Sequence, residues 1–474
     1  MVVNSERTKV IATVGPACNT EEKLWELVQA GADVFRLNFS HGSHEMHLQV
    51  IKLVRAINEK YGTSVALLQD LQGPKIRTGE VENNGVELIG GQKLIITTEK
   101  IIGNSERIYT SYKAMPRDVK AGDAILIDDG KLELKVLEVK GEEITTQVVF
   151  GGILKSKKGI NLPNTSVSEP SLTEKDREDL LFGLEHELDW IALSFVRHAD
   201  DIKDIKQIIA QSGRKAKVVA KIEKPEALVD IDNIIEACDG IMVARGDLGV
   251  EINMEDVPVW QKTMVKKCNM VGKPVIVATQ MMESMITSPR PTRAEANDVA
   301  NAVVDGADTV MLSAESASGM YPLESVQAMV KIIKAIEDNI DIFHKDWPLH
   351  PESSNFLRES LIASACKLAK DTKAKAIVGF SRTGFTATKI SSFRPSAKIF
   401  IFTDNKIVLN QLNLVWGVRA FYMEPKKTTD ETIEEMNKAL LQARLVAKGD
   451  VVINTSTMPM ESTYRTNMVK LSII

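Results

Sequence analysis

From Lys9 onward, short β-branched apolar runs alternate with longer amphipathic stretches along the first three quarters of the chain. The apolar runs that we interpret as strands cover residues 8–14, 33–38, 64–70, 189–194, 217–222, 239–244, 273–279 and 309–313. Helical stretches follow seven of them directly, for example 21–30, 200–211 and 293–305. This alternation is typical of β/α units around a parallel sheet. Eight units predict a closed (β/α)8 TIM barrel, whose functional residues lie at the carboxyl ends of the strands.

The third unit is interrupted, because its strand and the helix expected over 173–186 are far apart in the sequence. Residues 74–162 carry short strand-like runs broken by glycines, and Asp129-Gly130 is a hairpin signal. We interpret this segment as a small β-barrel domain inserted into a barrel loop. Inserts on that face commonly close over substrate, so we expect a lid.

A linker rich in proline and serine follows the predicted helix 322–339. Beyond it we expect helices over 358–370, 385–392, 405–413 and 430–447 and strands over 375–380, 398–402 and 450–454. This pattern predicts an open α/β domain. The expected domains are the barrel (1–73 and 163–343), the inserted lid (74–162) and the C-terminal domain (344–474).

Composition narrows the classes of protein. The hydrophobic fraction is 44%, the charged fraction 26% and the net charge −5, which does not favour nucleic-acid binding. The four cysteines have no CxxC spacing, so we expect neither disulfides nor zinc and a reducing compartment. No apolar stretch is long enough to act as a signal peptide or to cross a bilayer, so we expect a cytoplasmic protein with no membrane partner.

The predicted strand ends carry charged and hydroxyl side chains. In chain order they offer Arg36, Asn38, Ser40, Asp70, Lys75, Arg77, Lys221, Glu223, Arg245, Gly246, Asp247, Thr279, Gln280, Ser313 and Glu315. Lys221 and Glu223 are two residues apart, so their side chains should share one side of an extended strand. Glu223 and Asp247 follow adjacent strands and could share one divalent ion, for which Mg2+ or Mn2+ suits an oxygen-only ligand set. Arginine and lysine beside such an ion suit phosphoryl transfer.

A simpler interpretation stands beside each of these residues. A lysine and a glutamate at a strand end are more often a solvated ion pair than a catalytic couple. Arg36, Asp70, Arg77 and Glu315 could merely form the polar layers that close a barrel.

Several long motifs resemble the pyruvate kinase family in order and in position. They begin at Arg36 (RLNFSHG), Asp70 (DLQGPKIR), Lys158 (KGINLP), Lys221 (KIE), Met242 (MVARGDLGVE), Ala278 (ATQMMESM), Pro289 (PRPTRAEANDVANA) and Met311 (MLSAE). The resemblance covers essentially the whole chain. It implies transfer of the phosphoryl group of phosphoenolpyruvate to ADP with Mg2+ or Mn2+, giving pyruvate and ATP.

The resemblance also implies roles for individual residues. Lys221 neutralises the moving phosphoryl group, Arg36 and Arg77 hold phosphate, and Thr279 belongs to the route that protonates the enolate. Glu223 and Asp247 bind the metal, with the Gly246 and Asp247 amides at the substrate carboxylate. The implied contacts on the nucleotide side are Asn38, Ser40, His41, Arg77 and Lys158.

One departure from the family concerns the monovalent cation. In the potassium-dependent group the ion is held by residues matching Asn38, Ser40, Asp70 and the backbone of Leu71, and a glutamate stands where this chain has Lys75. A lysine there places an ammonium near the ion's position. We therefore expect activity without added K+.

In the C-terminal domain, residues 381–386 follow a strand and open a helix, which makes a phosphate site or a simple capped turn. The resemblance favours an allosteric effector phosphate at Ser381, Arg382, Thr383, Gly384 and Thr386. The partner loop 457–465 lacks the glycines of the sugar-bisphosphate pattern, which argues against fructose 1,6-bisphosphate and leaves a sugar monophosphate, a nucleotide or no effector open. The family is usually a homotetramer.

The remaining candidates favour packing. His41, His44 and His47 are three apart but lie at an expected helix start, where surface and capping roles are favoured and only His41 is a candidate ligand contact. Met281, Met282 and Met285 are expected in the core. Two rivals to the kinase stay open: a Mg2+-dependent lyase acting on pyruvate or oxaloacetate, and a degenerate barrel serving as a scaffold.

Overall fold

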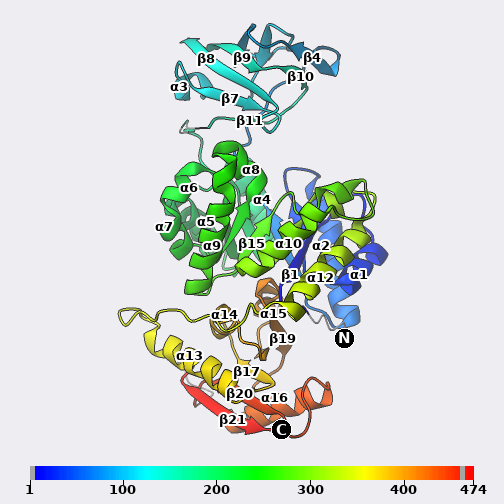
Figure 1. Cartoon of the computed structure of the whole chain (residues 1–474), viewed down its shortest axis with the longest axis vertical. Helices are drawn as coiled ribbons and strands as arrows, with labels where there is room; N and C mark the ends of the chain where they lie inside the picture. The colour runs from blue at the N-terminus through cyan, green and yellow to red at the C-terminus, as the bar shows by residue number, and fades with distance from the viewer. Residues whose placement is uncertain (1–5, 164, 166, 460–464) are drawn as a thin grey trace.

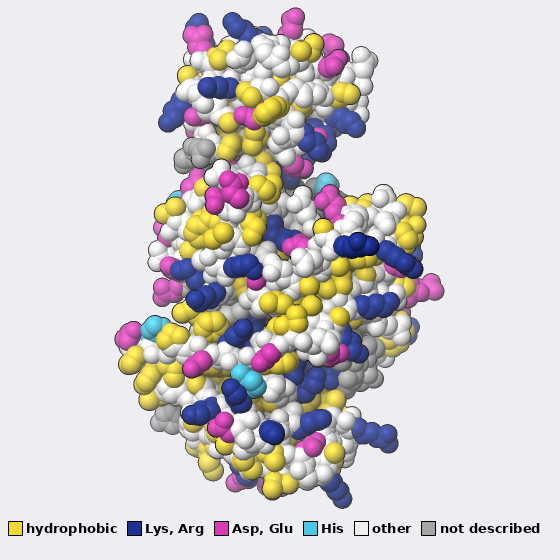
Figure 2. All heavy atoms as spheres, viewed as in Figure 1, with side chains coloured by type: hydrophobic (Ala, Val, Ile, Leu, Met, Phe, Trp, Pro, Cys, Tyr) yellow, Lys and Arg dark blue, Asp and Glu magenta, His cyan; other side chains and the backbone are white. Residues whose placement is uncertain are grey.

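The computed structural model describes residues 6–163, 165, 167–459 and 465–474. Three bodies lie in a row along the long axis of the molecule, with the inserted domain at one end, the barrel in the middle and the C-terminal domain at the other end (Figure 1). The molecule narrows to a waist between the inserted domain and the barrel (Figure 2). No helix in the described part of the chain is long and apolar enough to span a membrane.

Eight parallel strands close the central barrel, as the sequence predicts. They are β1 (Lys9–Thr13), β2 (Val34–Asn38), β3 (Ala66–Asp70), β12 (Trp190–Leu193), β13 (Lys217–Ile222), β14 (Gly240–Ala244), β15 (Val275–Ala278) and β16 (Thr309–Leu312). Nearly every residue of these strands is buried, because helices cover the outside and side chains fill the inside.

Helices surround the barrel. They are α1 (Glu21–Ala30), α2 (His44–Tyr61), α4 (Glu174–Glu185), α5 (Ala199–Gln211), α6 (Pro225–Val229), α7 (Ile231–Ala237), α8 (Arg245–Glu251), α9 (Val257–Val271), α10 (Arg293–Asp305), α11 (Ala314–Ala317) and α12 (Pro322–Asn339). Short 3-10 turns lie at Glu82–Asn84, Met254–Asp256, Glu283–Ile286 and Leu412–Leu414. Thr20, Thr173 and Thr292 cap their helices with the side-chain oxygen, which fixes where α1, α4 and α10 begin.

The inserted domain is a β structure with one turn of helix. Its six-stranded sheet has the order β11-β7-β8-β9-β5-β6, and β4 pairs with β10 in a second sheet. The bounds are β4 (Gly85–Leu88), β5 (Lys93–Thr97), β6 (Arg107–Tyr109), α3 (Met115–Asp118), β7 (Ala124–Ile127), β8 (Leu132–Lys140), β9 (Glu143–Phe150), β10 (Gly152–Lys155) and β11 (Ile160–Asn161). The predicted hairpin is confirmed, because Asp129 and Gly130 have positive φ angles between the antiparallel strands β7 and β8.

The C-terminal domain is an open five-stranded sheet of order β19-β18-β17-β20-β21, and helices accompany it. Its elements are α13 (Phe356–Asp371), β17 (Ala376–Phe380), α14 (Phe385–Ser392), β18 (Lys398–Thr403), α15 (Lys406–Gln411), β19 (Val418–Tyr422), α16 (Thr429–Gln442), β20 (Val451–Ser456) and β21 (Met468–Ile473). The sequence analysis missed β19 and β21 and made the last helix five residues too long, since α16 ends at Gln442 rather than at residue 447.

The C-terminal domain covers the face of the barrel at the amino-terminal ends of its strands. Leu414 packs among the side chains that fill the barrel interior, and its backbone oxygen accepts a hydrogen bond from the Thr309 hydroxyl (3.0 Å). The Trp190 indole donates to the Gln411 oxygen (3.2 Å). The amino-terminal face of the barrel is therefore blocked, which leaves the opposite face and the lid for substrate.

Candidate active site

Lys221 lies at the centre of a polar cluster at the carboxyl ends of the barrel strands. Its ammonium is 2.9 Å from Glu223 Oε1, 3.1 Å from Asp70 Oδ1 and 2.6 Å from the Ser194 hydroxyl oxygen. The side chain of Lys221 is 12% exposed, and those of Glu223 and Asp70 are 2% exposed. This burial excludes the solvated ion pair, and Lys221 and Glu223 share one side of the strand as predicted.

The charges in this cluster are strongly coupled. Burial lowers the pKa of Lys221, but the carboxylates of Asp70, Glu223 and Asp247 outweigh it and raise the pKa above its usual range. Burial raises the pKa of Asp70, but the cations Lys221 and Arg36 outweigh it and hold the pKa below its usual value. Lys221 is therefore an ammonium and Asp70 a carboxylate at neutral pH.

Arg36 is held in place from both sides. Its Nε and one terminal nitrogen each lie 2.7 Å from Asp70 Oδ2, and the other terminal nitrogen donates to the Thr13 hydroxyl (3.0 Å). That hydroxyl donates to the Leu312 backbone oxygen (2.8 Å), which joins the ends of β1 and β16. A guanidinium fixed in this way presents positive charge to an anion at the barrel mouth.

The donor set at Glu223 and Asp247 suits a divalent cation. Burial raises the pKa of Glu223, and Lys221 opposes this while the charge of Asp247 adds to it. A carboxylate whose ionised form is disfavoured by burial and by a neighbouring negative charge is a fitting place for a cation. No cluster of three or more metal-binding side chains is found in the described residues, so water or substrate would complete the coordination.

The helix α8 begins at this edge and contacts the end of β15. The Gly246 N–H donates to the Thr279 hydroxyl oxygen at 2.7 Å, and Asp247 follows in the first turn of α8. Thr279 has a φ of 68°, which is unusual for a β-branched residue, and the next residue Gln280 has a φ of 53°. Backbone strain of this kind clusters at functional sites.

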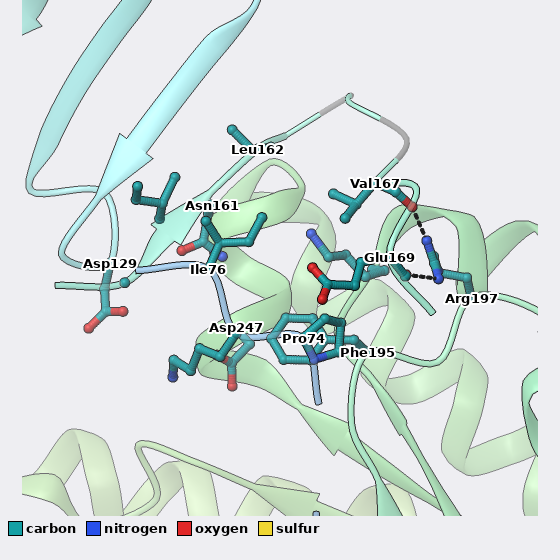
Figure 3. Close-up of a pocket in the computed structure, with 14 residues that line it drawn as sticks. Pro74, Ile76, Asp129, Asn161, Leu162, Val167, Glu169, Phe195, Arg197 and Asp247 are labelled. Atoms are coloured by element: carbon teal, nitrogen blue, oxygen red, sulfur yellow. Dashed lines mark hydrogen bonds between the residues drawn. The ribbon is translucent and has the colours of Figure 1, made fainter. Parts of the chain in front are cut away.

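A cleft separates the lid from the barrel face. Ile76, Asp129 and Asn161 lie on its lid side and Phe195 and Asp247 on its barrel side (Figure 3). The Arg197 guanidinium donates to the backbone oxygens of Val167 and Glu169 and so holds the segment that returns from the lid against the barrel. The cleft therefore extends from the lid to Asp247 at the start of α8.

Two of the residues predicted on the nucleotide side, His41 and Arg77, lie close enough together for the charge of Arg77 to act on His41. Burial lowers the pKa of His41, and the charges of Arg77, Lys75 and Arg36 lower it further, so the barrel and the lid both contribute cations here. The Arg77 guanidinium donates to the Lys157 backbone oxygen (3.2 Å).

Three further residues predicted on the nucleotide side lie within existing contacts. Lys158 pairs with Asp128 of the lid hairpin at 2.8 Å. Asn38 Oδ1 accepts the Ser40 N–H at 3.1 Å. A nucleotide would therefore compete with Asp128 for the Lys158 ammonium.

Asp70 and the Leu71 backbone oxygen, which we expect at the monovalent-cation position, both have partners within the protein. Both oxygens of Asp70 pair with cations, as described above, and the Leu71 backbone oxygen accepts a hydrogen bond from the Ser194 hydroxyl (2.7 Å). Lys75 is exposed on the wall of the cleft, and its positive charge contributes to the lowered pKa of His41. Among the described residues Lys75 forms no ion pair with Asp70.

Residues 381–386 follow β17 and open α14, as predicted. Ser381 is buried and its hydroxyl oxygen accepts the Gly384 N–H (3.0 Å), and the Thr386 hydroxyl is 2.7 Å from that of Thr466. Arg382 and Thr383 are exposed, and Arg382 pairs with Asp404 at 3.2 Å. Residues 460–464 of the partner loop lie outside the described residues.

The packing predictions are confirmed. Met281, Met282 and Met285 are fully buried, and all four cysteines are buried and unpaired. His44 lies 2.7 Å from Asp179, and His47 contacts the His41 backbone oxygen at 3.0 Å. Glu315 is buried and its oxygens accept the Ser313 and Met282 N–H groups, which is a structural role at the end of β16.

Comparison with known proteins decides the family. Residues 5–326 match the barrel domain of pyruvate kinase, and residues 359–472 match its alpha/beta domain. The chain belongs to the pyruvate kinase family. A pyruvate kinase of Geobacillus stearothermophilus is 44% identical over 99% of this chain and 80% of its own length, and one of Clostridium perfringens is 41% identical over 99% and 100%. A crystal structure of a pyruvate kinase from Cryptosporidium parvum superposes with a TM-score of 0.92 at 39% identity, covering 99% of this chain and 96% of that one.

As a pyruvate kinase the chain is an enzyme and a transferase, which decides against both the lyase and the scaffold. The sequence analysis missed three groups of the site: the Ser194 hydroxyl, the Thr13 hydroxyl and the Phe195 N–H, which donates to Glu223 Oε2 (2.9 Å). Thr13 and Ser194 lie at the ends of the first and fourth strands, where no candidates were sought. Both hydroxyls follow from the rule that functional side chains lie at the carboxyl ends of barrel strands, once the first and fourth strands are included.

Proposed function

We propose that this site transfers the phosphoryl group of phosphoenolpyruvate to ADP, giving pyruvate and ATP, with Mg2+ or Mn2+ and without K+. The observation that carries the proposal is the buried Lys221 ammonium, held by Asp70, Ser194 and Glu223 beside Arg36. A fixed pair of largely buried cations at the barrel mouth suits a phosphoryl group in transfer, because the reaction depends on positioning and charge stabilisation.

The roles are those that the family resemblance implies. Lys221 neutralises the moving phosphoryl group, while Arg36 and Arg77 hold phosphate from the barrel and the lid. Glu223 and Asp247 would hold the cation, which when bound supplies positive charge to substrate oxygens. Thr279 lies on the side where the enolate is protonated. The Gly246 and Asp247 amides serve the substrate carboxylate.

Independence from potassium is supported by the pairing of Asp70. One of its oxygens contacts Lys221 and the other Arg36, so two protein cations already neutralise this proposed ligand. The Leu71 oxygen already accepts one hydrogen bond. Neither group needs an added ion for charge balance.

Three further proposals come from the family resemblance. Asn38, Ser40, His41 and Lys158 contact the nucleotide. A phosphorylated metabolite binds at loop 381–386 and regulates the enzyme. The enzyme is a cytoplasmic homotetramer.

The test is pyruvate formation from phosphoenolpyruvate, ADP and Mg2+ by wild type and Lys221→Met. We expect Lys221→Met to lower kcat by at least about 10²–10³-fold, because one preorganised charge at the reacting group is lost. The matched control is Lys203→Met, which removes an exposed lysine of α5 and should leave kcat unchanged. Equal activity of Lys221→Met and Lys203→Met would contradict the proposal.

A further inference from the structure

Thr279 is held by an ion pair that lies outside the polar cluster around Lys221. Arg245, the first residue of α8, donates from one terminal nitrogen to the Thr279 backbone oxygen at 2.9 Å. The same guanidinium pairs with Asp298 of α10 through two bonds, each of 2.7 Å. The Arg245 side chain is only 12% exposed. A bidentate pair of this kind fixes direction as well as distance.

This contact acts on a strained residue. Thr279 has a φ of 68°, although it is β-branched and follows directly after β15. Such a conformation persists only where surrounding contacts impose it. The Arg245 guanidinium supplies that contact at the carbonyl, and Asp298 orients the guanidinium.

The Thr279 side chain is fixed by the neighbour of Arg245. Its hydroxyl oxygen accepts the Gly246 N–H at 2.7 Å, and the hydroxyl donates to the Ala278 backbone oxygen at 2.6 Å. A Cβ atom at position 246 would lie 3.2 Å from that hydroxyl oxygen, so glycine permits the approach. Arg245 and Gly246 thus hold the backbone and the side chain of Thr279 from consecutive positions.

We propose that the Arg245–Asp298 pair positions the Thr279 hydroxyl for protonation of the enolate, with Asp298 acting only through Arg245. The inference rests on the proposed function, because it takes the role of Thr279 from there. It adds two positioning residues, neither of which touches the substrate.

The step at issue is the conversion of enolpyruvate to pyruvate. The electron pair of the carbon–carbon double bond forms a new C–H bond at the methylene carbon, while the enolate oxygen becomes the ketone oxygen. The proton comes from a water molecule at the Thr279 hydroxyl, and solvent replaces it. In reverse, the same step exchanges the methyl hydrogens of pyruvate with solvent, so it can be measured without phosphoryl transfer.

The experiment compares wild type with Asp298→Asn, which keeps the shape of the side chain and removes its charge. Deuterium incorporation into the pyruvate methyl group is followed by NMR in D2O with Mg2+ and ATP, and pyruvate formation is assayed separately. We expect Asp298→Asn to slow exchange by about ten- to a hundredfold, because a misplaced catalytic group costs that much. KM for phosphoenolpyruvate should stay within about twofold, since the substrate contacts are intact.

Two variants serve as controls. Asp232→Asn removes an exposed carboxylate that pairs with Lys267 on α9, and it should exchange like wild type. Asp298→Glu keeps the charge and should recover part of the exchange rate. If Asp298→Asn does not fold, Arg245→Lys gives the same readout, because lysine keeps the charge without the bidentate geometry.

The outcomes separate this inference from the proposed function. If Thr279→Ala exchanges like wild type, the proposed role of Thr279 fails and the inference fails with it. If Thr279→Ala abolishes exchange while Asp298→Asn exchanges like wild type, only the inference is overturned. A raised KM for phosphoenolpyruvate with unchanged exchange in Asp298→Asn would overturn it as well.

Discussion

At the scale of single residues, Lys75 carries the prediction that potassium is not required. It lies exposed on the cleft wall, and its charge helps to lower the pKa of His41, after burial and Arg77. The ammonium is therefore close enough to the barrel mouth to act on groups there, although Asp70 takes its ion pairs from Lys221 and Arg36.

We predict that Lys75→Glu makes the enzyme dependent on potassium. The variant removes a positive charge and adds a negative one, so a monovalent cation should then raise kcat by about tenfold or more, while wild type changes by less than about twofold. Activity is measured in tetramethylammonium buffer with and without KCl. The pKa of His41, followed by NMR, should rise in the variant, because the repulsion that disfavours its protonated form becomes attraction.

Lys75→Gln is the matched neutral variant, and its His41 pKa should lie between those of the other two proteins. If the His41 pKa rises in Lys75→Glu but KCl does not change the activity, the charge at position 75 does not control the potassium requirement. Strong activation of wild type by KCl would refute potassium independence directly.

Most residues of the site could be predicted from the sequence, because strands of a parallel barrel end on one face. Lys221, Glu223, Asp70 and Arg36 follow from that rule and meet within hydrogen-bonding distance. The Phe195 N–H could not be predicted, because it depends on a backbone conformation with a φ of 55° that no residue type signals. The pairing of Arg245 with Asp298 joins positions 53 apart in the sequence, and only the fold reveals it.

At the scale of elements, the lid is tied to α8 through Glu251. Its Oε1 accepts from Asn161 at the end of β11 (2.9 Å) and from Lys224 after β13 (2.8 Å). The Glu251 and Lys224 side chains are 2% and 9% exposed. Glu251 Oε2 has no hydrogen-bond partner among the residues that the structure describes. One carboxylate oxygen thus joins a lid strand, a barrel strand and the helix that begins at Arg245.

We predict that Glu251→Gln lowers the free energy of unfolding by about 3–5 kcal/mol, because the Lys224 ammonium is left buried without its partner. Urea-induced unfolding measures the change. Glu138→Gln breaks an exposed pair with Lys140 in the same lid and should cost less than about 1 kcal/mol. Equal losses of unfolding free energy in Glu251→Gln and Glu138→Gln would mean that burial does not determine how much an ion pair stabilises this protein.

The elements that sequence analysis missed share a physical cause. The edge strands β19 and β21 are partly exposed, so polar residues such as Arg419 and Lys470 interrupt their apolar residues. The central strands β17, β18 and β20 are almost wholly buried and were found. Apolar runs identify strands covered on both faces, and edge strands escape that criterion.

At the scale of the whole molecule, the contact between the barrel and the C-terminal domain was not predicted. Arg394 follows α14 and is 2% exposed, and it reaches three barrel groups: Asp308 Oδ1 (3.2 Å), Asn269 Oδ1 (2.7 Å) and the Gly306 backbone oxygen (2.8 Å). Asp308 in turn accepts the Val275 N–H at the start of β15 (3.1 Å). The Arg394 side chain therefore reaches from the loop after α14 to Asp308, which is bonded to the start of β15, and β15 leads to Thr279.

We predict that Arg394→Met lowers the free energy of unfolding by about 3–5 kcal/mol, because it leaves the Asp308 carboxylate, 4% exposed, without its cation. The double variant Arg394→Met/Asp308→Asn should be less destabilised than Arg394→Met, because Asp308→Asn removes the buried charge that Arg394→Met leaves unpaired. Lys470→Met, which breaks an exposed pair with Asp430 in the same domain, is the matched control and should cost less than about 1 kcal/mol. Denaturant unfolding of wild type, the single variants Arg394→Met and Asp308→Asn, the double variant and the control measures these differences. A double variant as unstable as the sum of its parts would show that Arg394 stabilises the interface by packing on Trp416 rather than by charge.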